Sequence, residues 1–149
     1  MISKILVPTD GSKTSRKAAR YAVELAKQLK ASVIVLSIID KRSFAGQTIS
    51  ASDTARHVIE PIEDYLREAA ESYAEEIKSL CDKNDIRSKI VIAIGHPVEE
   101  IIKESLRSKV SLIIMGSHGR SALAATVLGS ITYGVIHKDT KIPVMVVKK

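Results

Sequence analysis

Five stretches of the chain are almost continuously apolar, and each is short enough to be a β-strand. Continuous rather than alternating hydrophobicity indicates burial on both faces, which is typical of strands in a parallel sheet. The first stretch is halted by Pro8, and Pro143 near the start of the last suits a strand at the edge of a sheet. The predicted strands cover residues 2–7, 32–39, 89–94, 112–115 and 142–147.

Between these strands, apolar residues recur every three or four positions, the spacing of a helix with one buried face. The first such helix follows the turn Thr9-Asp10-Gly11-Ser12, where Ser12 or Asp10 can cap it. Cys81 lies beside the apolar stripe of the longest helix and is expected to be a small buried side chain. The later helices are predicted over about 53–84, 98–106 and 131–137.

Strands and helices therefore alternate along a chain of 149 residues, which is the length of one domain, 1–149. Right-handed crossovers would produce an open, doubly wound parallel sheet of α/β class with helices on both faces. Ligands of such sheets bind beyond the carboxyl ends of the strands, where the strand order reverses. If the first and fourth strands are neighbours there, Thr9-Asp10 and the loop after Met115 face one crevice.

The candidate chemistry lies between residues 112 and 132. Gly116 and Gly119 follow a buried strand, and Gly129-Ser130 precedes a helix-like segment. A strand, a glycine-rich connection and a helix start can cradle phosphate, because unpaired N–H groups and the positive end of the helix dipole face the anion. The glycines could also simply turn the chain, but three of them after a buried strand favour a nucleotide or phosphate site.

The spacing Gly116-x2-Gly119-x9-Gly129-Ser130 resembles the G-2x-G-9x-G-(S/T) motif of the ATP-binding universal stress proteins. Residues 5–12, the Gly95-His-Pro97 turn and residues 142–147 are also similar to segments of that family, in the same order. The resemblance extends over the whole chain. It implies a Rossmann-like fold with strand order 3-2-1-4-5 and a homodimer joined largely through the last strand, 142–147.

The resemblance also implies a site for ATP, or for ADP or AMP. Asp10 would lie at the ribose and the backbone of Ile38 at the adenine, and Mg²⁺ would be held through the phosphates. The hydroxyls of Ser130 and Thr132 can donate to phosphate oxygens. Arg120 could add a charged contact, or could simply be a solvated loop residue. The remaining implied site residues are Pro8, Thr9, Met115, Gly116, Gly119, Gly129 and Ile131.

The composition of the chain disfavours several classes of protein and of binding site. No apolar run approaches the roughly 20 residues that span a bilayer, and the N-terminus lacks a signal-peptide pattern, so a cytoplasmic protein is expected. The net charge is +6, but the basic residues are scattered, which disfavours nucleic acid and favours small anionic ligands. One cysteine excludes an internal disulfide, and the four histidines show no metal-ligand spacing.

The leading hypothesis is an ATP-binding regulator of the stress response that acts as a nucleotide-dependent switch on an unknown protein partner. Walker A and Gly-x-Gly-x-x-Gly motifs are absent, which argues against a P-loop NTPase and a dinucleotide dehydrogenase. The alternative is a slow ATP hydrolase or nucleotidyl-transfer enzyme, for which Asp10 or His118 would be the base. The sequence shows no residue that would orient either of these side chains. A nucleotide-free interaction module is disfavoured by the intact glycines.

Two further expectations concern turns and loops. His118 and His96 occupy predicted turns, where each is expected to be a surface or capping residue. The polar stretch 41–52 has no clear period and is expected to be a loop, either mobile or a flap near a ligand.

Overall fold

The computed structural model describes residues 1–40, 42, 53–119, 128–138 and 140–149, and for 53–61 it describes the backbone only. The predicted loop over 41–52 therefore lies outside the described residues, apart from Arg42. The candidate Arg120 lies outside them as well.

Five parallel strands form one sheet in the order β3-β2-β1-β4-β5, which confirms the predicted fold class and strand order. Pairs form between β1 and β2, β2 and β3, β1 and β4, and β4 and β5. The strands are β1 (Lys4–Thr9), β2 (Ser32–Asp40), β3 (Ser88–Gly95), β4 (Leu112–Gly116) and β5 (Val144–Val147). The helices are α1 (Lys13–Leu29), α3 (Asp53–Lys83), α4 (Pro97–Arg107) and α5 (Ser130–Ile136).

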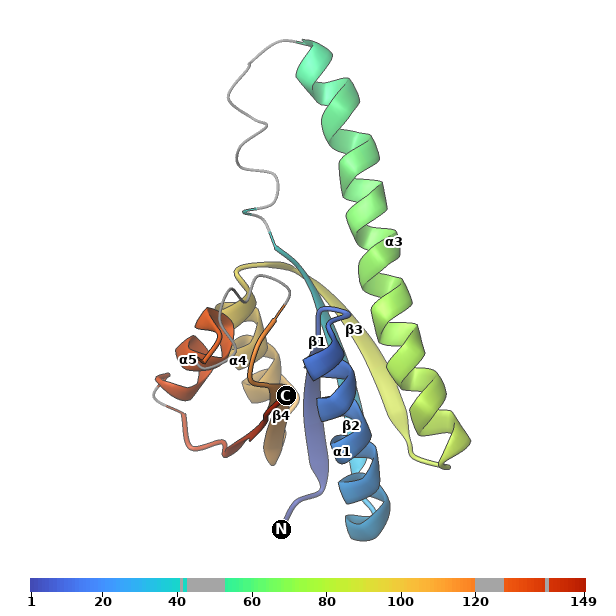
Figure 1. Ribbon diagram of the computed structural model, residues 1–149, viewed down its shortest axis with the longest axis vertical. Helices are drawn as coiled ribbons and strands as arrows, with labels where there is room; N and C mark the ends of the chain where they lie inside the picture. Colours follow the sequence, from blue (N-terminus) through green and yellow to red (C-terminus); the bar gives the residue numbers. More distant parts are fainter. Residues whose placement is uncertain (41, 43–52, 120–127, 139) are drawn as a thin grey trace.

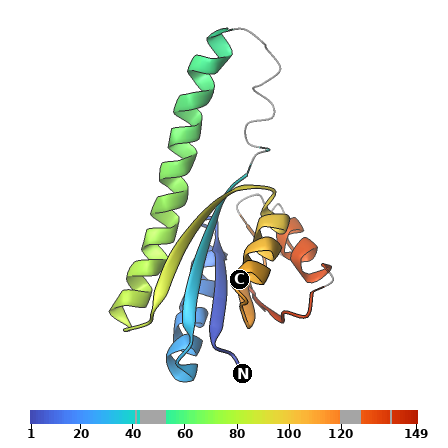
Figure 2. The same cartoon turned by 180° about the vertical axis from the view of Figure 1, so that it is seen from behind.

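The helices cover both faces of the sheet, α1 and α3 on one and α4 and α5 on the other (Figures 1 and 2). Successive residues of β1 point to opposite faces of the sheet and pack in different cores. Ile5 and Val7 pack in the core that contains α1 and α3. Leu6 packs in the core that contains Val98 of α4 and Val135 of α5. Burial on both faces explains why the strand sequences are apolar without alternation.

The strand β1 does not stop at Pro8 as predicted but continues to Thr9. Its pairing with β4 covers only Ile5 and Leu6. Pro8, which has no amide hydrogen, therefore lies where β1 and β4 are no longer paired. The last strand begins at Val144 rather than at 142, and the carbonyl of Pro143 accepts a hydrogen bond from the Ile113 amide at 3.0 Å. Because β5 is at the edge of the sheet, the placement predicted from Pro143 is confirmed.

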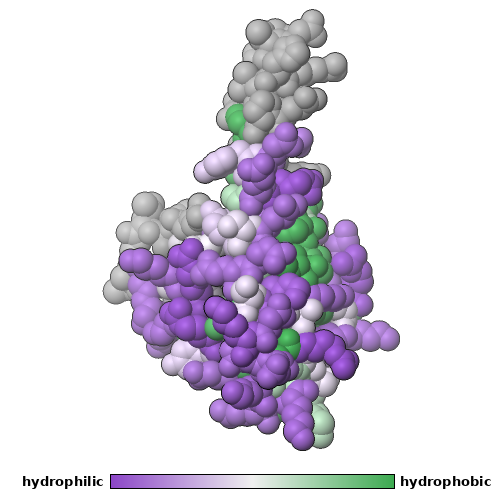
Figure 3. All heavy atoms as spheres, turned by 90° about the vertical axis from the view of Figure 1, so that its right-hand side faces the viewer, coloured by the Kyte–Doolittle hydropathy of each residue, from purple (hydrophilic) through white to green (hydrophobic). Residues whose placement is uncertain are grey.

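The long helix predicted over 53–84 is confirmed as α3. Its C-terminal half packs on the sheet through Ala70, Ala74, Ile77 and Cys81, while its N-terminal part extends well past the carboxyl ends of the strands (Figures 1 and 2). Seen from the α3 side, the molecule is mostly hydrophilic, with an apolar patch to one side (Figure 3). Cys81 is fully buried as expected, and this burial raises the pKa of its thiol.

Gly116 ends β4 where α1 leaves no room for a side chain. A Cβ atom at this position would lie 2.9 Å from the carbonyl carbon and Cβ of Thr14, and 3.0 Å from its oxygen. We expect Gly116→Ala to lower the free energy of unfolding by about 1–3 kcal/mol, the usual cost of overpacking. Urea denaturation measures this loss.

A comparison is Gly134→Ala, because the added methyl group would meet the side chain of Val98 rather than backbone atoms. The loss for Gly134→Ala should therefore be smaller. Equal urea midpoints for the wild type and Gly116→Ala would show that the first turn of α1 gives way without cost.

Candidate functional site

A cleft of about 430 Å³ opens at the carboxyl ends of β1, β2 and β4. It lies where β1 and β4 are no longer paired, so the predicted crevice between these strands is present. Gly129 is not one of its lining residues but immediately precedes them. The predicted site residues that line the cleft are Pro8, Thr9, Asp10, Ile38, Met115, Gly116, Gly119, Ser130, Ile131 and Thr132.

Asp10 follows β1 directly and is fixed by the turn that leads into α1. Its Oδ1 accepts a hydrogen bond from the Ser12 amide at 2.9 Å, and the Ser12 side chain caps α1 by accepting from the Ser15 amide at 3.2 Å. Its Oδ2 lies 2.8 Å from the position that a Cβ of Gly119 would occupy. Of the two predicted capping residues, Ser12 therefore caps the helix, and Asp10 orders the turn and lies against the glycine loop.

Gly129 packs directly on the loop that contains Gly119. Its amide donates to the carbonyl of Ser117 at 2.8 Å, and a Cβ would lie 3.1 Å from that oxygen and 3.2 Å from the Cα of His118. With φ at −60°, Gly129 is favoured here by this close approach rather than by its backbone conformation. The loop 117–119 and the segment that leads into α5 thus form one wall of the cleft.

The start of α5 has no side-chain cap, because its N-cap residue is Gly129. The first N–H groups of a helix have no partner within the helix, so Ser130, Ile131 and Thr132 carry donors that a cap does not satisfy. All three residues line the cleft. This arrangement can receive an anion.

The Thr132 hydroxyl has a different role from the predicted one. It is buried and donates to the carbonyl of Gly116 at 2.8 Å, which ties the first turn of α5 to the end of β4. A hydroxyl has one proton to donate, so this group does not offer it to a phosphate in the structure. Ser130, in contrast, is exposed at the cleft.

The opposite part of the cleft is apolar. Leu36 and Ile38 lie two residues apart on β2 and therefore on the same face of the strand, and Met115 of β4 joins them. Sequence reasoning missed Leu36, Pro97 and Ile101, because nothing in a uniformly apolar strand or helix marks the residues that border a cavity. An apolar wall next to a polar one is typical of sites that bind small molecules.

An ion pair lies at the rim beyond this apolar wall. The guanidinium of Arg42 contacts the carboxylate of Asp40 at 2.7 Å, and the Arg42 amide donates to the same carboxylate at 2.9 Å. Partial burial works against the charged form of Asp40, but the hydrogen bonds and the charge of Arg42 outweigh it and lower the pKa of that carboxyl. Both residues line the cleft, and neither was predicted from the sequence.

The two turn histidines differ. His96 is exposed and is the N-cap residue of α4, as expected of a surface or capping residue. His118 is only 8% exposed and lines the cleft, so the expectation of a surface or capping residue was wrong. Its Nδ1 lies 2.7 Å from the Ser117 hydroxyl, and its carbonyl accepts a hydrogen bond from the Thr14 hydroxyl. The buried position follows from the close packing of Gly129 on this loop.

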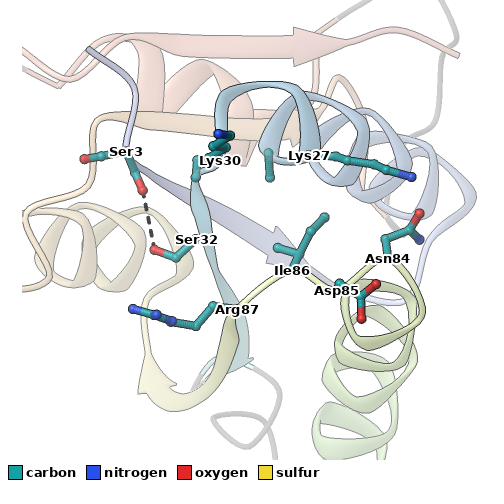
Figure 4. A pocket seen from close by; sticks show the side chains of 10 residues that line it. Ser3, Lys27, Lys30, Ser32, Asn84, Asp85, Ile86 and Arg87 are labelled. Carbon is teal, nitrogen blue, oxygen red and sulfur yellow. Dashed lines mark hydrogen bonds between the residues drawn. The ribbon is translucent and has the colours of Figure 1, made fainter.

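A second hollow, of about 390 Å³, lies at the opposite end of the sheet (Figure 4). Three cations, Lys27, Lys30 and Arg87, border it together with Asp85. The helices α1 and α3 both end beside it, and cations are favoured near the negative end of a helix dipole. The ends of the two helices therefore favour positive charge at this hollow.

Within the described ranges, no three His, Cys, Asp or Glu side chains gather in a way that could hold a metal ion. No helix in the same part of the chain is long and apolar enough to cross a membrane.

Known proteins are similar to this chain over its whole length. The universal stress protein MJ0577 from Methanocaldococcus jannaschii is 37% identical, with 100% of this chain and 96% of that protein covered. MJ0531 from the same organism is 32% identical, with 100% and 84% covered. The solved structure of MJ0577 superposes with a TM-score of 0.85, at 34% identity over 100% of this chain and 97% of that one.

Two more distant solved structures show the same fold with a nucleotide bound. One is a universal stress protein in complex with cAMP, at 23% identity and a TM-score of 0.62, covering 99% of this chain and 97% of that one. The other is the universal stress protein from Archaeoglobus fulgidus in complex with dAMP, at 17% identity and a TM-score of 0.65, covering 99% and 98%.

The sequence profile of the universal stress protein family matches residues 1–148, nearly the whole chain. The parallel sheet with order 3-2-1-4-5 agrees with the solved structures of that family. The chain therefore belongs to the universal stress protein family.

Proposed function

We propose that this protein binds an adenine nucleotide, ATP foremost, in the cleft between β1 and β4, and that it acts as a nucleotide-dependent switch in the stress response. The observation that carries the proposal is the convergence of Asp10, Gly119 and the uncapped start of α5 on one side of a cleft whose other side is apolar. Such a cleft matches a molecule that is flat and apolar at one end and anionic at the other.

The parts of the nucleotide have complementary places in this cleft. The adenine ring would pack on Leu36, Ile38 and Ile101, with the backbone of Ile38 toward its polar edge. The ribose hydroxyls would donate to the carboxylate of Asp10. The phosphates would accept hydrogen bonds from the first amides of α5, and the short distance between Gly129 and the 117–119 loop would let them approach the main chain.

The choice of an adenine nucleotide is supported by relatives. Solved universal stress proteins are in complex with cAMP and with dAMP, two ligands that share the adenine ring. The preference for ATP follows from the glycine spacing that resembles the ATP-binding members. Mg²⁺ would be held through the phosphates, because no carboxylate group in the described ranges forms a metal site of its own.

A homodimer through the last strand belongs to the same proposal. The strand β5 ends the sheet, so its outer edge has no neighbouring strand within the described residues. It consists of Val144, Met145, Val146 and Val147, with Met145 40% exposed. An open edge of apolar residues invites pairing with a second strand, and a second copy of the chain can supply it.

Native mass spectrometry of the protein as purified, without added nucleotide and with Mg²⁺ present, tests both parts. A dimer that carries ATP is the expected result, and it would indicate tight binding with slow turnover. ADP or AMP alone would favour the alternative, a slow ATP hydrolase or nucleotidyl-transfer enzyme with Asp10 or His118 as base. A protein that neither carries nor binds added ATP would remove the proposed function and leave the fold.

A further inference from the structure

His118 carries a buried nitrogen, Nε2, that none of the described residues partners. The side chain is 92% buried, since 8% of it is exposed, and Nε2 is inaccessible to solvent. No hydrogen bond to this atom is formed by any residue that the structure describes. A buried polar group without a partner costs the folded state free energy and therefore calls for an explanation.

The rest of this residue is held firmly. Its carbonyl accepts from the Thr14 hydroxyl, its Nδ1 contacts the Ser117 hydroxyl, and its Cα lies under Gly129. The amide of Ser117 in turn donates to the carbonyl of Val147 at 2.9 Å. Contacts with α1, β5 and the segment before α5 therefore fix this short loop. The unsatisfied Nε2 belongs to a side chain whose backbone is held in place from three sides.

The contact with the Ser117 hydroxyl also affects which ring nitrogen of His118 carries the proton. When this hydroxyl donates to Nδ1, the neutral ring carries its proton on Nε2, which then is a donor. The donors at the start of α5 line the same cleft and favour an anion, and an anion accepts hydrogen bonds. A donor at Nε2 therefore matches the phosphate end of a nucleotide.

We propose that His118 is a phosphate-binding residue whose Nε2–H donates to the bound nucleotide, with Ser117 holding the ring in the required tautomer. This inference rests on the proposed nucleotide-binding function and deepens it. His118 is one of the residues that line the cleft, and a small shift of the loop 117–119 that keeps the Ser117 contact would expose the enclosed nitrogen to a ligand there. The contact would convert an unsatisfied group of the free protein into a satisfied one in the complex.

The test compares ATP, AMP and adenosine by isothermal titration calorimetry in the wild type, His118→Leu and His118→Gln. Leucine fills similar space without a donor, and glutamine retains an N–H at a similar reach. We expect His118→Leu to bind ATP and AMP about tenfold to a hundredfold more weakly, the range for a hydrogen bond to a charged group. Adenosine affinity should change less than twofold, and His118→Gln should recover part of the loss.

A merely structural role predicts a different result, namely that adenosine and ATP lose affinity together in His118→Leu. If that variant does not fold, ¹⁵N NMR of the histidine rings in the wild type decides, because the Nε2 signal should shift with ATP and AMP but not with adenosine. Equal affinities in all three proteins, or an unmoved signal with ATP bound, would overturn the role of His118 while nucleotide binding stands. A wild type that binds none of the three ligands would instead overturn the proposed function itself.

Discussion

Gly129→Val is expected to weaken ATP binding at least about a hundredfold while the protein stays folded. A Cβ at this position already lies 3.1 Å from the Ser117 carbonyl and 3.2 Å from the Cα of His118, and valine adds two methyl groups beyond it. The loop 117–119 must then move away from the start of α5, which separates the amides that would meet the phosphates. A loss of 100-fold corresponds to about 2.7 kcal/mol, or two hydrogen bonds to a charged group at the low end of their range.

Gly129→Ala provides a graded comparison, because its single methyl group requires a shift of only a few tenths of an ångström. Its loss of affinity should lie between those of the wild type and valine. Calorimetry gives the affinities, and far-ultraviolet circular dichroism confirms the fold. A folded Gly129→Val protein with wild-type ATP affinity would contradict the phosphate-binding assignment of this segment.

Asp10→Ala is expected to weaken ATP binding about tenfold to a hundredfold, because the ribose hydroxyls lose a charged acceptor. The sharper expectation concerns 2′-deoxy-ATP. The wild type should bind it more weakly than ATP, and in Asp10→Ala this difference should largely disappear, since the group that reads the 2′-hydroxyl is gone. The four affinities form a double-mutant cycle that isolates the contact between Asp10 and the ribose.

Asp82→Ala is the control for the change in charge, because this exposed carboxylate pairs with Lys78 on α3, away from the cleft. Asp82→Ala should bind both ATP and 2′-deoxy-ATP with the affinities of the wild type. If 2′-deoxy-ATP is disfavoured equally by the wild type and Asp10→Ala, the carboxylate does not contact that hydroxyl, and the orientation proposed for the nucleotide is wrong.

The fold could be predicted in detail because the signals that specify it are local and repeated. Each strand is an uninterrupted apolar run, and the stripe along 53–84 fixed a 31-residue helix to within one residue. Pro8 misled the prediction, because proline is excluded from a strand only where its amide would be needed. That condition depends on how far β1 and β4 remain paired, which no sequence pattern reveals.

The candidate site could be predicted only where a motif marks it. The glycines were found because their spacing is distinctive, and Asp10 and Ile38 were found through the family resemblance. Leu36 and Ile101, in contrast, are ordinary core residues until a cavity is seen beside them. The roles of Thr132 and His118 depended on contacts with Gly116 and Ser117 that fold-level reasoning could not supply. The glycines also proved to have packing roles, since Gly116 lies against α1 and Gly119 against Asp10.

The length of α3 has a practical consequence for measurements of the assembly in solution. Its 31 residues span about 46 Å at 1.5 Å per residue. A compact chain of 149 residues has a radius of gyration of only about 15 Å. With α3 extending past the sheet, even a monomer has more hydrodynamic drag than a sphere of its mass and leaves a gel-filtration column early (Figure 1). Elution volume alone would then overestimate the mass of the particle, so the number of subunits must come from a method that measures mass directly.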